Sequence, residues 1–129
     1  MTVRPRIIAL IIALAGFGLL GLAATPSQAQ ETATVAVGDF YFCSESFEGG
    51  ECVTTIEAGD TVLWEFSGAA STHTTTGDGW DSGNISGGTF SFTFDEEGEF
   101  AYVCNIHPSL MTGRIAVEAG PDTPVDSDD

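Results

Sequence analysis

Four side chains that can bind a soft metal ion lie in the second half of the chain. Cys104, His107 and Met111 fall within the single run YVCNIHPSLMTGRIAV, and His73 lies upstream of it. The chain has no other histidine, and its only other methionine is the initiator. A thiolate and a thioether suit Cu(I), whereas imidazoles suit both Cu(I) and Cu(II). The four residue types therefore match the ligand set of a mononuclear copper site that transfers electrons.

A full set of protein ligands also bears on whether the site is catalytic. A catalytic metal site keeps one coordination position open for water or substrate. His73, Cys104, His107 and Met111 together would leave no evident open position, so the pattern favours an electron carrier over an enzyme. The main alternative is an exported copper-delivery or copper-storage protein, although such sites are usually rich in Met or His.

Three further interpretations use the same side chains differently. Zinc accepts thiolate and imidazole, so His73, Cys104 and His107 are chemically suited to it as well. Cys104 as a nucleophile with His107 as its base would need an orienting third group and a substrate cleft, and the sequence suggests neither. A purely structural sandwich would need none of these residues.

The elements that must position these side chains are strands. Seven segments rich in Val, Ile, Thr and aromatic residues are separated by Gly, Asp and Ser clusters, which predicts an all-β sandwich or barrel. Alternation places Val62, Trp64 and Phe66 on one face, and it does the same for the aromatic residues of the segment 88–94. We expect these side chains in the core. The seven segments span residues 32–37, 39–43, 52–56, 61–66, 88–94, 99–104 and 114–118.

Strand direction predicts where the candidate ligands meet. If the loop 67–87 stays at the end where the strand 61–66 finishes, the strand 88–94 runs back and the turn after it returns the chain to the same end. His73 and Cys104 then arrive together, with His107 and Met111 in the short loop beyond. Binding residues are often carried on loops at one end of a rigid scaffold. Thr74 can offer a backbone N–H or a hydroxyl to such a site.

The N-terminal segment predicts export. Arg4 and Arg6 precede an apolar stretch, and Ser27-Gln28-Ala29 resembles a signal-peptidase site, so we assign residues 1–29 to a signal peptide. A retained membrane helix is the alternative, but the apolar stretch is shorter than the roughly 20 residues that a span needs. We expect one domain over residues 30–118, an acidic disordered tail over 119–129, and a periplasmic, extracellular or cell-surface location.

Export gives the cysteine count a meaning, because three cysteines cannot all pair in an oxidising compartment. Cys43 and Cys52 bracket the polar segment SESFEGGE, whose ends could meet in a disulfide bond worth roughly 2–3 kcal/mol. Cys104 is then left over, and a bound metal would protect its thiol. The alternative is that Cys104 is only a small buried hydrophobic residue.

The acidic composition limits the partners. The chain has 19 Asp and Glu against three Arg and no Lys, a formal net charge of −16, and only Arg114 is basic beyond the predicted signal peptide. This charge excludes nucleic acid and anionic membrane surfaces as partners. It would steer the protein toward a basic redox partner such as a c-type cytochrome. Solubility in a salty habitat is the other interpretation, and the spread of acids over nearly every loop favours it.

Taken together, these motifs resemble the plastocyanin/azurin (cupredoxin) family of small blue copper proteins. The resemblance rests on YVCNIHPSLMTGRIAV, on STHTT around His73, on DSG at 81–83 and on AGDTVLWEF before them, and it spans residues 53–117. It implies a Greek-key β-sandwich of seven to eight strands.

The resemblance also implies a monomer with one type 1 copper ion, cycling between Cu(I) and Cu(II) and held by His73, Cys104, His107 and Met111. Electrons would leave through the exposed edge of His107 to a redox partner, a c-type cytochrome or a membrane redox complex. The chain departs from the family pattern in three places. Three residues separate His107 from Met111, Thr74 stands where many members have Asn, and the segment 43–52 is an insert.

Overall fold

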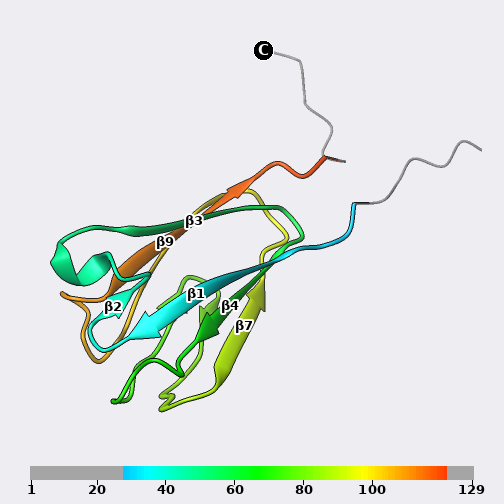
Figure 1. Ribbon diagram of the computed structural model, residues 1–129. Helices are drawn as coiled ribbons and strands as arrows, with labels where there is room; N and C mark the ends of the chain where they lie inside the picture. The colour runs from blue at the N-terminus through cyan, green and yellow to red at the C-terminus, as the bar shows by residue number, and fades with distance from the viewer. Residues whose placement is uncertain (1–27, 122–129) are drawn as a thin grey trace, which may run out of the picture.

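Two packed β-sheets make up the part of the chain that the computed structural model describes, residues 28–121 (Figure 1). The first sheet has the order β2-β1-β4-β7 and the second the order β3-β9-β8-β5-β6. The first comprises β1 (Thr32–Gly38), β2 (Tyr41–Phe42), β4 (Thr61–Glu65) and β7 (Thr89–Thr93). The second comprises β3 (Cys52–Glu57), β5 (Thr76–Gly77), β6 (Trp80–Asp81), β8 (Gly98–Val103) and β9 (Thr112–Glu118).

The strand pairing ties distant parts of the chain together. The pairs β1–β4 and β3–β9 are parallel, and the others are antiparallel. Figure 1 shows β1, β4 and β7 side by side in one layer, with β3 and β9 adjacent in the other. The fold is the expected all-β sandwich.

The core follows the predicted alternation. Val62, Trp64 and Phe66 are all fully buried, because successive strand residues point to opposite faces. Phe90 and Phe92 on the neighbouring strand β7 pack against the core, and Phe94, which directly follows β7, is buried. These aromatic residues are therefore structural, as expected.

The structure has nine strands among residues 28–121, whereas seven to eight were expected. The added elements are β5 and β6, a short hairpin inside the loop 67–87. This hairpin closes because Gly77 leaves room for the Trp80 ring, which a Cβ at that position would overlap. The Trp80 indole N–H donates to the Thr75 hydroxyl at 3.1 Å. Asp-Gly at 78–79 is a hairpin signal that sequence reasoning passed over.

The expected strand 39–43 is also shorter than predicted, since only Tyr41 and Phe42 form β2. Phe40, Cys43 and Ser44 have φ values of 72°, 53° and 60°, and no other non-glycine residue in the described part of the chain has a positive φ. Left-handed backbone cannot continue a β-ladder. A turn therefore precedes β2, and a loop with the single-turn helix η1 (Ser46–Glu48) follows it.

The cysteines pair as proposed. Cys43 and Cys52 form a disulfide bond that closes the loop containing η1, and Cys104 is free and buried. The predicted signal peptide lies outside the described residues except for its last two, and so does most of the predicted tail. Within residues 28–121 the structure has no helix of the length and apolarity needed to cross a bilayer.

Candidate metal centre

Two loops at one end of the sandwich bring the candidate ligands together. His73 lies in the loop between β4 and β5, where its backbone exchanges hydrogen bonds of 3.0 and 2.9 Å with Ile85. Cys104 follows β8 directly, His107 lies in the turn beyond it, and Met111 directly precedes β9. The loop after β4 therefore stays at the end predicted from strand direction.

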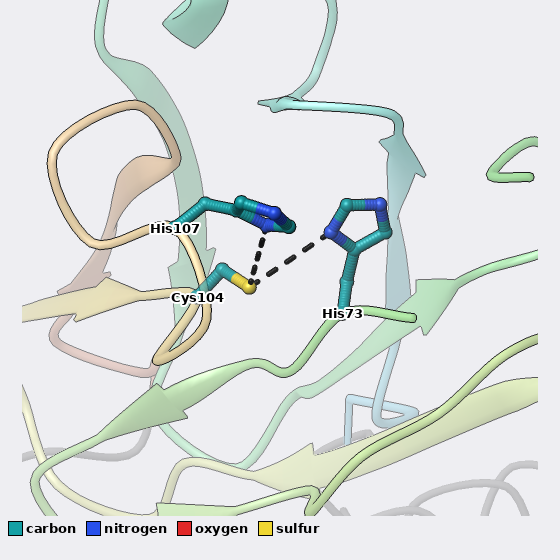
Figure 2. A group of neighbouring side chains, drawn as sticks. All are labelled: His73, Cys104 and His107. Carbon is teal, nitrogen blue, oxygen red and sulfur yellow. Dashed lines mark hydrogen bonds between the residues drawn. The ribbon is translucent and has the colours of Figure 1, made fainter. Parts of the chain in front are cut away.

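The side chains of His73, Cys104 and His107 face a common point. The Cys104 Sγ lies 3.9 Å from the Nδ1 of His73 and 3.7 Å from the Nδ1 of His107. Figure 2 shows both rings turned toward this sulfur. One candidate ligand atom from each residue lies within 4.8 Å of the other two.

These separations are suitable for one metal ion. A nitrogen bound at about 2.0 Å and a sulfur bound at about 2.3 Å, with roughly 120° between the bonds, lie about 3.7 Å apart. The separations between Cys104 and the two histidines are close to this value. The donor set and its spacing thus fit a trigonal arrangement of two imidazoles and one thiolate.

Burial separates His107 from the rest of the group. The His73, Cys104 and Met111 side chains are fully buried, whereas His107 is partly exposed. His107 is therefore the member of the cluster through which the site reaches the surface.

Met111 is tied to the same turn through its main chain. Its carbonyl accepts the Cys104 N–H at 3.0 Å, and its own N–H donates to the His107 carbonyl at 3.0 Å. This pairing holds the short loop closed between β8 and β9. The Met111 backbone is thereby held next to Cys104 and His107, and its side chain is buried.

Thr74 connects the two ligand-bearing loops through both groups that the sequence suggested. Its backbone N–H donates to the Cys104 Sγ at 3.3 Å, and its hydroxyl accepts the Asn105 N–H at 2.9 Å. The hydroxyl also lies 3.0 Å from that of Thr76. Thr74 thereby fixes Cys104 against the loop that carries His73.

Two residues that sequence reasoning missed touch the cluster. The Asp39 Oδ1 lies 3.0 Å from the Nε2 of His73, and the Phe40 ring meets the His107 ring edge-on with centroids 4.9 Å apart. The hydrogen bonds from His73 and then Ser71 hold the pKa of the Asp39 carboxyl well below its usual range. Asp39 precedes His73 by 34 positions, and no local sequence signal marks their contact.

Burial also sets the protonation of the aromatic residue nearest Cys104 on β8. Tyr102 is almost completely buried, and desolvation raises the pKa of its phenol above the usual value. Its hydroxyl lies 3.7 Å from the Cys52 sulfur, and its ring packs against that of Trp64 with centroids 5.5 Å apart. The phenol is therefore neutral and part of the hydrophobic core.

Residues 35–118 match the model of a family described as copper binding proteins of the plastocyanin/azurin family. No curated protein matches the sequence.

Several solved structures share the fold. A reduced mutant of amicyanin superposes with a TM-score of 0.55 at 22% identity, covering 70% of this chain and 86% of that one. A purple cupredoxin from Nitrosopumilus maritimus gives 0.54 at 21%, covering 67% and 99%. An oxidized amicyanin mutant gives 0.52 at 20%, covering 66% and 80%. At sequence identities this low, these similarities show a shared fold and nothing more.

Proposed function

The chain belongs to the plastocyanin/azurin family of copper-binding proteins, and from that premise we propose that it is an exported one-electron carrier. Its cofactor is copper, and the cluster of His73, Cys104 and His107 fits a single type 1 site. In this proposal those three residues would hold the ion, and Met111 would be a fourth, weaker ligand.

The main support for this proposal is that a buried free thiol and two imidazole nitrogens converge on one point. The separations of 3.9 and 3.7 Å from the Cys104 sulfur support shared coordination. When bound, copper supplies the one-electron change between Cu(I) and Cu(II). The protein's part is to offer ligands that suit both states and to restrain them, since Cys104 is buried and accepts the Thr74 N–H.

Electron exchange with a partner would use the exposed edge of His107. Ile106 and Leu110 flank it in the same loop, and each is 43% exposed. The partner we propose is another redox protein, a c-type cytochrome or a membrane redox complex. The large negative charge of this protein would attract a basic partner surface.

Export of a monomer to the periplasm or cell surface is the cellular part of the proposal. The Cys43–Cys52 disulfide supports an oxidising compartment. Residues 1–29 would then be the signal peptide, residues 30–118 the copper domain and residues 119–129 an acidic tail. A saturated ligand set with no position for substrate supports a carrier and not an enzyme.

Spectra of the copper-loaded protein test the ligand assignment. We expect intense visible thiolate-to-Cu(II) absorption, a small parallel hyperfine splitting in the electron spin resonance spectrum, and reversible one-electron voltammetry. Cys104→Ser should abolish the visible band, and His73→Ala should weaken copper binding and change the spectrum. Met111→Leu should keep the colour and shift the potential. A colourless, redox-silent copper complex would refute the carrier and favour copper delivery or storage.

A further inference from the structure

The turn between β1 and β2 contacts both candidate histidines at once. Asp39 in this turn meets His73 at 3.0 Å, and the adjacent Phe40 packs edge-on against His107 with ring centroids 4.9 Å apart. The Phe40 ring also lies 6.2 Å from that of His73. Two consecutive residues thus contact both imidazoles from outside the ligand-bearing loops.

The Asp39 carboxylate is held in place by several donors. It accepts hydrogen bonds from the Ala70 N–H at 3.1 Å, from the Ser71 N–H at 3.0 Å and from the Ser71 hydroxyl at 2.7 Å. These donors belong to the loop that leads into His73. The carboxylate is therefore fixed relative to the His73 ring before any metal binds.

This carboxylate determines which nitrogen of His73 carries the proton. A carboxylate only accepts hydrogen bonds, so the Nε2 at 3.0 Å must be the protonated nitrogen of the neutral ring. The Ser71 hydroxyl, 3.2 Å from the same Nε2, donates its own proton to Asp39. The Nδ1 is left with its lone pair toward the Cys104 sulfur, the orientation that a metal ligand needs.

The backbone of Phe40 shows that its position is imposed by the surrounding structure. Its φ of 72° lies in the left-handed region, which a residue with a bulky side chain rarely adopts. Such a conformation persists only where neighbouring contacts hold it. The contact to His107 is one of them, and the disulfide at Cys43 anchors the chain shortly after.

We propose that Asp39 and Phe40 are positioning residues of the copper centre, Asp39 by fixing the His73 tautomer and Phe40 by holding the His107 ring. The proposal rests on His73 and His107 being ligands, as in the proposed function. A carboxylate behind an imidazole makes the ring a stronger electron donor to a bound metal, which stabilises Cu(II) more than Cu(I). Asp39 therefore lowers the reduction potential, and Phe40 slows metal loss.

Nitrogen NMR of the metal-free protein tests Asp39 independently of redox activity. In the wild type we expect a protonated Nε2 and an unprotonated Nδ1 on His73, with slow exchange of the Nε2 proton. Asp39→Asn should speed that exchange, weaken Cu(II) binding about 10- to 100-fold and raise the potential. Asp39→Glu should recover part of each effect. Asp95→Asn, which removes an exposed charge in the β7–β8 turn, should change none of them.

Phe40→Gly tests the second residue with little risk to the fold, because glycine readily adopts a positive φ. We expect the ring-current shift on the His107 protons to vanish and copper release to a chelator to become about tenfold faster. Unchanged exchange of the His73 proton and unchanged Cu(II) affinity in Asp39→Asn would overturn the role of Asp39. Unchanged shifts and release in Phe40→Gly would overturn that of Phe40. In either case the proposed function still stands if the copper-loaded wild type is blue and His73→Ala changes that visible absorption.

Discussion

Replacing Thr74 by Val tests how the two ligand-bearing loops are connected. Valine keeps the shape of threonine but removes the hydroxyl that accepts the Asn105 N–H at 2.9 Å and meets the Thr76 hydroxyl at 3.0 Å. The backbone N–H of Thr74 still donates to the Cys104 sulfur. The variant therefore separates the connection between the loops from the hydrogen bond to sulfur.

The expected loss of stability is about 1–2 kcal/mol. A hydrogen bond contributes about 0.5–1.5 kcal/mol net, and two are lost. Thr74 is almost fully buried, but Asn105 is exposed, so water can reach its freed N–H and the cost stays near the lower end. For a domain of roughly 100 residues, about 1 kcal/mol corresponds to a fall of about 4–8 °C in the midpoint of thermal unfolding.

Amide hydrogen exchange is the sharpest assay, because it reports on the Asn105 N–H itself. In the metal-free protein, Thr74→Val should speed exchange of this amide about tenfold, the equivalent of about 1.4 kcal/mol. The matched control Thr74→Ser keeps the hydroxyl and should leave the exchange of Asn105 slow. The visible absorption of the copper-loaded variant should stay that of the wild type. Wild-type exchange at Asn105 in Thr74→Val would refute the connection.

Two further predictions concern the scaffold beneath the site. Gly113→Ala would drive a Cβ into the Tyr102 ring across the β8–β9 pair, so we expect urea denaturation to show a free energy of unfolding lower by about 1–3 kcal/mol. The control Gly68→Ala, whose Cβ would meet nothing nearer than 3.6 Å, should change this free energy little. Equal stability of the two variants would contradict the packing argument. Reducing the Cys43–Cys52 bond in the metal-free protein should lower the free energy of unfolding by about 2–3 kcal/mol, because the bond closes a loop of about ten residues. An unchanged denaturation midpoint would show that the unfolded chain gains no freedom on reduction.

The sequence by itself determined the features that depend on residues close together along the chain. Alternating apolar residues predicted the buried face of β4, because side chains on a strand point to opposite faces in turn. Cys104, His107 and Met111 share one short loop, so their spacing alone indicated that they lie together. Cysteine parity and the polar segment between Cys43 and Cys52 indicated the pairing that the structure contains.

Only the tertiary structure decided which distant groups support that loop. The contact between Asp39 and His73 exists because β1 pairs with β4 in parallel and the turn after β1 then meets the loop after β4. The left-handed backbone of Phe40 likewise depends on contacts made after the sheets pack. Strand periodicity specifies which face of a strand is buried, but it does not specify which strand lies beside it. The residues that surround the metal centre therefore follow from sheet pairing, and the ligand types follow from the sequence.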